Sequence, residues 1–137
     1  MKVTVDTNFL ISATQWDYSV SHRLLLRLIE KDVKIYTTSE ILNEFTEVLK
    51  RDFKYNADEI IAIIGKMLSF VTLIIPKKQV NIIKNDPDDN KVIECALESN
   101  SKYIITYDKH LLNLKKYKAI DIITPEKFSD KVNNYLR

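Results

Sequence analysis

The sequence predicts a three-layer α/β/α fold around a central parallel sheet. Short segments rich in β-branched and aromatic residues alternate with longer segments whose apolar residues recur at helical spacing. Strands that alternate with helices form parallel sheets, because each connecting helix packs back onto one face of the sheet. Helices are therefore expected on both faces.

The predicted strands are short and mostly apolar, as buried strands of parallel sheets are. They are "KVTV" at 2–5, "VKIYT" at 33–37, "VTLII" at 71–75, "KYIIT" at 102–106 and, as a fifth candidate, "AIDII" at 119–123.

The predicted helices follow from apolar residues three and four positions apart. The second of them opens with a capping box formed by Thr37 and Glu40, and the third opens at Asn56. The helices are expected at 20–28, 38–50, 56–68, 87–99 and 125–136.

The length of 137 residues suits a single domain, expected to span 1–137. Hydrophobic residues make up 45% and charged residues 29%, as in globular proteins, and no apolar run approaches the roughly 20 residues that cross a bilayer. The opening "MKVTVDTNFL" lacks the apolar core and cleavage site of a secretory signal. We therefore expect a cytoplasmic protein with no membrane partner.

The net charge and the single cysteine exclude some classes of function. A formal charge of +2 is too small to identify a partner. Cys95 stands alone, so no intramolecular disulfide can form, and its apolar neighbours Val92 and Ile93 indicate a core thiol. The spacing places no base beside it, as a catalytic cysteine requires.

Acidic residues gather at one edge of the predicted sheet. Asp6 ends the first strand, Asp108 follows the strand at 102–106, and "DPDD" at 86–89 begins a helix. The carboxyl ends of parallel strands and the N-termini of the following helices share one edge, where open α/β sheets place their sites. Three chain segments thus bring carboxylates to the same rim.

One glutamate of the helix at 38–50 is directed toward this rim. Glu40, Glu44 and Glu47 form a stripe, at ~100° per residue, beside the apolar arc of the helix. Glu44 lies nearest that arc, so it is expected to lean toward the sheet, whereas the other two point into solvent.

Within "DPDD", Asp89 is the acid expected to face the sheet. It lies three and four residues before Val92 and Ile93, so its side chain shares their face of the helix, and Asp88 is the weaker candidate. A purely structural role is the alternative, because Asp86 and Pro87 fit an N-cap and a first helical position.

Each of the four acids has such an alternative. Asp6 and Asp108 fit turns, Glu44 fits a solvated helix surface, and Asp89 fits a helix cap. Four carboxylates on one rim repel one another, however, unless a cation neutralises them. Oxygen ligands favour Mg²⁺ or Mn²⁺, and the chain lacks the His/Cys spacing of zinc sites. The chemistry expected is metal-assisted attack of water on a phosphodiester.

These segments resemble the motifs of the PIN-domain nucleases, in order and across nearly the full length. "VTVDTNFLI" resembles the opening strand, whose metal-binding Asp falls on Asp6, and "ILNEFTEVL" places the family's Glu at Glu44. "DPDDNKVIECAL" resembles the third motif, with Asp89 seven residues before Ala96, and "YIITYDKHLL" places the fourth acid at Asp108.

The resemblance implies a PIN-like sandwich and a ribonuclease that hydrolyses RNA with metal-activated water. Asp6, Glu44, Asp89 and Asp108 would be the catalytic and metal-binding residues, with Thr7, Asn8 and Thr106 as polar support. It also implies the toxin role of a VapC-like toxin–antitoxin pair, an antitoxin protein as partner, and a homodimer. Many VapC-type toxins carry a basic residue where this chain has Asp88, so the resemblance does not extend to the choice of RNA.

Lys91 and Lys109 lie close to the expected rim and are predicted to contact the RNA backbone. Other functions stay open. Phosphoryl transfer by a haloacid-dehalogenase-like protein would use Asp6 as the nucleophile, but "DTN" lacks the second Asp that this pattern requires. A receiver-like module expects an acid pair near the first strand and its phosphorylated Asp at a later strand, and neither alternative uses Glu44. A non-catalytic PIN-like module that binds RNA or protein, and an RNA-processing nuclease outside a toxin–antitoxin pair, are the remaining alternatives.

Overall fold

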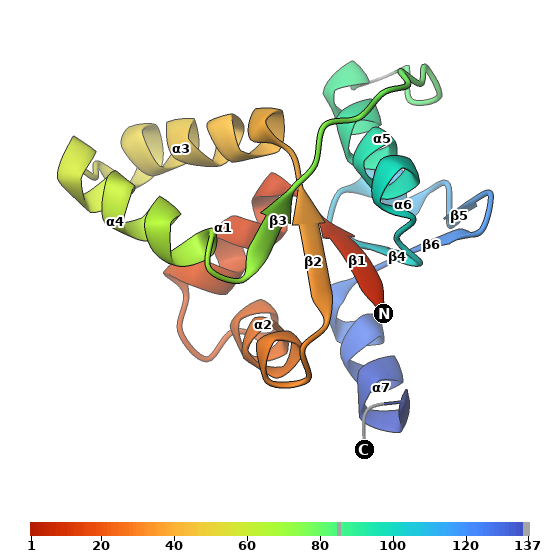
Figure 1. Ribbon diagram of the computed structural model, residues 1–137, viewed down its shortest axis with the longest axis horizontal. Helices are drawn as coiled ribbons and strands as arrows, with labels where there is room; N and C mark the ends of the chain where they lie inside the picture. Colours follow the sequence, from red (N-terminus) through yellow and green to blue (C-terminus); the bar gives the residue numbers. More distant parts are fainter. Residues whose placement is uncertain (85, 136–137) are drawn as a thin grey trace.

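The computed structural model describes residues 1–84 and 86–135, which form one six-stranded sheet flanked by helices (Figure 1). The strands are β1 (Lys2–Val5), β2 (Lys34–Thr37), β3 (Val71–Leu73), β4 (Tyr103–Ile105), β5 (Lys116–Tyr117) and β6 (Ile120–Ile123). Their order across the sheet is β3-β2-β1-β4-β6-β5, and every pair is parallel except β5 with β6. The predicted α/β class and parallel sheet are confirmed.

All the described helices except the last one, which follows the last strand, lie between strands in the chain, as expected for parallel crossovers. The helices are α1 (Thr7–Gln15), α2 (Val20–Glu30), α3 (Ser39–Phe53), α4 (Ala57–Met67), the 3₁₀ turn η1 (Pro87–Asp89), α5 (Asn90–Ser99), α6 (Lys109–Leu112) and α7 (Pro125–Tyr135). Position 136, the predicted end of the last helix, lies outside the described residues.

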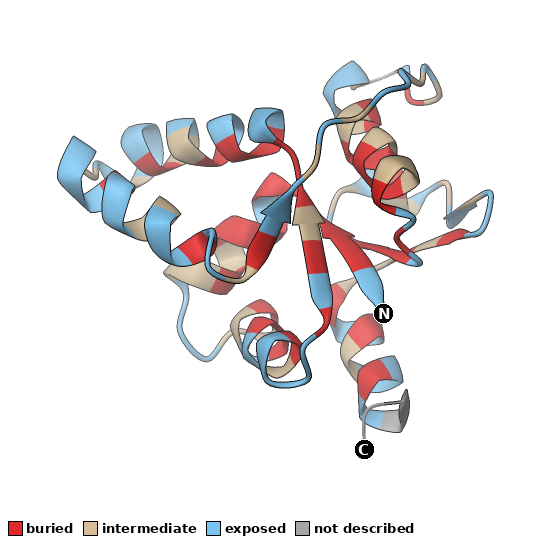
Figure 2. Ribbon diagram, in the orientation of Figure 1, coloured by how far each residue is buried: buried red, intermediate tan, exposed pale blue. Residues whose placement is uncertain are grey.

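Side-chain contacts show which helix covers which face. The Thr4 hydroxyl of β1 lies 2.8 Å from the Ser101 hydroxyl just beyond α5, so this face carries α5. Tyr103 of β4 pairs with the adjacent residue of β1 and therefore points to the other face, where its ring packs edge-on against Phe128 of α7. Buried residues fill both interfaces (Figure 2).

The structure corrects several predicted boundaries. No helix was predicted at 7–15, yet α1 begins directly after β1, because Asp6 caps it by accepting the Phe9 N–H at 2.9 Å. The capping box of Thr37 and Glu40 is wrong. Thr38 is the N-cap of α3, and its hydroxyl accepts the Ile41 N–H. The predicted opening of α4 at Asn56 is confirmed by a capping box with Glu59.

The strand order fixes where a site can form. The chain adds β2 and β3 on one side of β1 and then returns to place β4 on the other side. Ligands of open α/β sheets bind at such a switch point, outside the carboxyl ends of the strands. Here the switch point lies between Asp6 after β1 and Asp108 after β4. Within the described part of the chain, no helix is both long and apolar enough to cross a membrane.

Candidate functional site

A cavity of about 130 Å³ opens at the switch point. Six of the ten described residues that line it carry carboxylates, and none of the ten is basic. They are Asp6, Thr7, Asn8, Ile41, Glu44, Asp86, Asp88, Asp89, Val92 and Asp108. The four acids singled out in the sequence therefore lie around one cavity, and their assignment as ligands and catalysts stays a proposal.

Asp6 is fixed in place from two directions. Its Oδ1 accepts the Phe9 N–H at 2.9 Å, and its Oδ2 accepts a hydrogen bond from the Thr106 hydroxyl. The residue is only 6% exposed. Burial, more than any neighbouring charge, raises the pKa of Asp6 from 3.8 to about 6, although both hydrogen bonds lower it.

Thr106 joins Asp6 to Asp108. Its hydroxyl donates to Asp6 and also accepts the Asp108 N–H at 2.9 Å. Asp108 in turn caps α6, because its Oδ1 accepts the N–H groups of His110 at 2.8 Å and Leu111 at 3.2 Å. The two acids at the switch point are thus held by the same buried threonine.

Asp89 is the least satisfied acid of the cavity. Neither it nor Asp86 makes a side-chain cap hydrogen bond, so the helix start does not use these carboxylates as the structural alternative supposed. Asp89 Oδ2 is buried and has no hydrogen-bond partner among the described residues. Burial raises the pKa of Asp89 most, and the adjacent Asp108 raises it further.

Glu44 of α3 and the α1 residues Thr7 and Asn8 also line the cavity. Glu44 is an exposed residue that still lines the cavity. Its pKa is raised, first by partial burial and then by the negative charge of Asp88. Thr7 is buried and donates to the Ile41 carbonyl at 3.2 Å, which ties α1 to α3.

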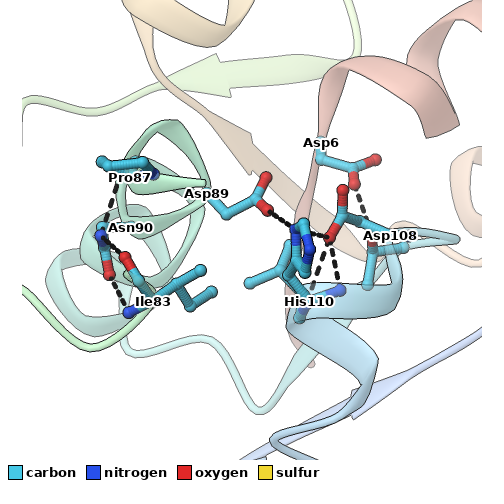
Figure 3. Close-up of polar contacts among 9 residues, drawn as sticks. Asp6, Ile83, Pro87, Asp89, Asn90, Asp108 and His110 are labelled. Carbon is cyan, nitrogen blue, oxygen red and sulfur yellow. Dashed lines mark hydrogen bonds and ion pairs between the residues drawn. The ribbon is translucent and has the colours of Figure 1, made fainter. Parts of the chain in front are cut away.

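Two further residues, Asp86 and His110, lie among these acids, although the sequence analysis did not single them out as ligands. One candidate ligand atom from each of Asp86, Asp89, Asp108 and His110 lies within 4.8 Å of the others. Figure 3 shows His110 between Asp89 and Asp108, and its Nδ1 lies 3.6 Å from Asp89 Oδ2 and 3.8 Å from Asp108 Oδ1. The sequence did offer a signal, because Asp86 belongs to "DPDD" and His110 to "DKH".

The two lysines predicted to contact RNA differ in their surroundings. Lys91 Nζ lies 3.1 Å from Glu40 and 3.3 Å from Asp88, so two carboxylates already neutralise it. The Asp88 side chain is 74% exposed, compared with 15% for Asp89, which agrees with the choice of Asp89 as the inward acid. Lys109 begins α6 and is exposed at the same edge.

Residues 2–110 match the model of the PIN domain, which covers most of the chain, the first three motif segments described above and the fourth as far as His110. The chain belongs to the PIN domain family. This PIN domain is 32% identical to the uncharacterized protein MJ1680 of Methanocaldococcus jannaschii, over 99% of the chain and 94% of that protein.

A solved structure shares the fold. The PIN domain superposes on a chain from the crystal structure of VapBC2 from Rickettsia felis bound to a DNA fragment from their promoter, with a TM-score of 0.63. The match covers 90% of this chain and 98% of that chain at 16% identity. At this identity the similarity establishes the fold alone.

Proposed function

We propose that this PIN domain is a Mg²⁺- or Mn²⁺-dependent endoribonuclease that hydrolyses RNA phosphodiester bonds with water as the nucleophile. The observation that supports it most is the convergence of six carboxylates on one cavity of about 130 Å³. Acids confined in this way disfavour one another's ionisation, and a divalent cation relieves that repulsion. Gathering carboxylates in one cavity destabilises a fold unless a ligand compensates, so such a cluster favours a binding site over a purely structural role.

The donor set suits a hard divalent cation. Asp89 Oδ2 is a buried acceptor without a hydrogen-bond partner among the described residues. A buried oxygen that binds a metal ion needs no hydrogen-bond donor, so this feature fits a metal ligand. Asp6, Glu44, Asp89 and Asp108 would hold the ion, and Asp86 and His110 lie near enough to contribute. Such an ion lowers the pKa of attacking water and stabilises charge on the leaving oxygen.

The chain's own residues provide orientation. Thr106 holds Asp6 through its hydroxyl proton and the Asp108 backbone through its oxygen, so two acids keep a fixed relation to each other. The N-termini of α1 and α6 supply further N–H donors to the same two carboxylates. Side chains held in this way lose little conformational entropy when they engage a ligand.

RNA cleavage and end-group analysis test the proposal. With Mn²⁺ present, single-stranded or looped RNA should give products with 5′-phosphate and 3′-hydroxyl ends, because water attacks in place of the neighbouring ribose hydroxyl. EDTA should abolish cleavage. Cyclic 2′,3′-phosphate ends or full activity in EDTA would refute the mechanism, and RNA binding without cleavage in saturating Mn²⁺ would favour a binding module.

The RNA backbone should approach through Lys109 and Lys91, since the acids themselves repel phosphate. A double Lys109→Ala, Lys91→Ala variant should bind RNA more weakly and with a shallower dependence on salt. Because Lys91 already contacts Glu40 and Asp88, RNA phosphate would have to compete with those carboxylates. An unchanged affinity and salt slope would remove both lysines from the interface.

A toxin of a toxin–antitoxin pair is the setting we propose for this activity. The support is the fold shared with a chain of the VapBC2 complex. An antitoxin protein would then bind this chain, which is also expected to form a homodimer. A small open reading frame beside the gene, whose product co-purifies with the chain, would support this setting. An isolated gene would favour RNA processing.

A further inference from the structure

The segment between β3 and η1 is fastened along α5 by helix side chains. Residues 74–84, here called the strap, form neither helix nor strand and run beside α5 in Figure 1. Glu98 accepts the Lys77 N–H at 2.7 Å, and Glu94 accepts the Val80 N–H at 3.0 Å. Asn90, Glu94 and Glu98 are spaced four residues apart, so their three side chains share one face of the helix.

Asn90 holds the strap differently from the two glutamates. Its Oδ1 accepts the N–H groups of Ile82 at 3.0 Å and Ile83 at 2.9 Å. Its Nδ2 donates to the carbonyls of Ile83 at 2.9 Å and Pro87 at 3.1 Å. The residue is 4% exposed. A carboxamide can both accept and donate twice, whereas a carboxylate only accepts, so this position uses the full capacity of an amide.

The two carbonyls bound by Asn90 lie on either side of an acid of the cavity. Ile83 precedes Asp86 in the chain and Pro87 follows it, and the same amide holds both (Figure 3). Asn90 also comes directly after Asp89, whose backbone N–H donates to the Asp86 carbonyl at 3.0 Å. One buried side chain therefore holds the backbone on both sides of Asp86, directly beside Asp89 in the chain.

We propose that Asn90 is the positioning residue of the acid cavity: its carboxamide holds the start of α5 to the strap, so that Asp86 and Asp89 stay in the cavity against the repulsion of the other carboxylates. This inference rests on the proposed function, since it assigns Asn90 a role toward the cation. Residues behind the ligands of a metal site typically change its affinity by about 10- to 100-fold when they are removed.

Mn²⁺ binding by Asn90→Ala and by Glu98→Ala tests the assignment. Glu98→Ala frees one strap backbone group and Asn90→Ala frees three, but Glu98 lies at the far end of the strap, next to Lys77. Calorimetric titration should show Mn²⁺ affinity about 10- to 100-fold weaker in Asn90→Ala and within about twofold of wild type in Glu98→Ala. A merely structural Asn90 would lower the metal-free melting temperature and leave the Mn²⁺ affinity of the folded variant unchanged.

The outcomes separate this inference from the proposed function. If wild type binds neither Mn²⁺ nor Mg²⁺, the proposal of a metal-dependent activity is wrong, and so is the role assigned to Asn90. If wild type binds Mn²⁺ and folded Asn90→Ala binds it equally well, the cation site stands and only the role of Asn90 is overturned.

Amide hydrogen exchange in the wild type tests the inference even if Asn90→Ala does not fold. If the hydrogen bonds of Asn90 to the strap strengthen cation binding, then by thermodynamic linkage a bound cation must stabilise those hydrogen bonds by the same free energy. Saturating Mg²⁺ should therefore slow exchange of the Ile82 and Ile83 amides, both bound to Asn90, by more than threefold. The Lys77 and Val80 amides should change less. Equal effects on all four amides, or no effect, would overturn the assignment.

Discussion

The two ends of α5 treat buried polar groups in opposite ways. At its C-terminus, the hydroxyls of Thr4, Ser99 and Ser101 lie within 2.6 to 3.5 Å of one another in a neutral cluster. Before its N-terminus, Asp89 Oδ2 is buried without a hydrogen-bond partner among the described residues, in a cavity lined by carboxylates. Thr4 and Asp6 belong to the two regions, although only one residue separates them in the chain.

The difference indicates what each region is for. Hydroxyls that satisfy one another can be buried at little cost and tie β1 to the end of α5. Carboxylates that face one another destabilise the folded state, so their burial is consistent with a site for a cation. The hydroxyl cluster should therefore respond to mutation through stability and the acid cavity through activity.

Asp89→Asn should give the largest effect, a loss of activity without a loss of stability. Loss of one carboxylate should reduce RNA cleavage in Mn²⁺ on the order of 10²- to 10³-fold, or about 3–4 kcal/mol of transition-state stabilisation. Without metal, the variant should be as stable as wild type or more stable, because a repelling charge is gone. Cleavage rates and urea unfolding in EDTA measure the two quantities. Wild-type cleavage, or a large loss of metal-free stability, would contradict the assigned role.

The metal-free protein should lose stability as the pH rises. The pKa of Asp6 is raised to about 6 in the folded state, so the unfolded chain ionises first, and each pH step between about 4 and 6 favours unfolding. The difference from the ordinary value of 3.8 corresponds to about 3 kcal/mol. Urea unfolding of wild type and Asp6→Asn in EDTA should show the two curves diverging by about this amount over that interval.

Saturating Mn²⁺ provides the control for this pH dependence. The cation should reduce the loss of wild-type stability that accumulates between about pH 4 and 6, since it favours the ionised acids. A constant difference between wild type and Asp6→Asn from pH 4 to pH 7 would mean that Asp6 titrates like an exposed carboxyl.

Ser101→Ala should lower stability and leave the acid cavity unaffected. The change removes a hydroxyl that lies 2.8 Å from the Thr4 hydroxyl and 2.6 Å from the Ser99 hydroxyl, and with it the two shortest hydrogen bonds of the buried cluster. We expect a loss of about 1–3 kcal/mol in the free energy of unfolding. Ser69→Ala is a matched control, because its hydroxyl is exposed, and it should change stability by less than about 0.5 kcal/mol. Weaker Mn²⁺ binding in Ser101→Ala would show that the two regions are coupled.

The parallel sheet could be predicted from the sequence because the patterns that indicate strands and helices lie within short segments of the chain. Alternating strands and helices imply parallel pairing, and Asp6 and Asp108 follow their strands directly, so their common edge could be inferred. The helix α1 was missed because "TNFLISATQ" continues an apolar, β-branched run, in which a short helix and a strand look alike. The Asp6 side chain as N-cap was the signal that distinguished them.

The positions of Asp86 and His110 could not be read from local pattern. Asp86 reaches the cavity because Asn90 fastens both Ile83 and Pro87, and that contact depends on the path of an irregular strap. His110 faces Asp89 because the four-residue helix α6 turns immediately after Asp108. The placement of Asp86 follows from hydrogen bonds between segments, and that of His110 from the cap that Asp108 provides, and neither follows from periodicity.

Cys95→Ala should give the smallest effect, because the proposed reaction uses water and not this thiol as the nucleophile. Cys95 is fully buried beside the hydroxyl cluster, where its Sγ accepts a hydrogen bond from the Thr4 hydroxyl at 3.7 Å. Burial raises the pKa of its thiol to about 12, so almost no thiolate exists at neutral pH. The variant should cleave RNA within about twofold of wild type and lose about 1 kcal/mol of stability. In the folded wild type, a thiol reagent at pH 8 should label Cys95 only as fast as the protein unfolds, whereas rapid labelling together with loss of cleavage would place this thiol in the chemistry.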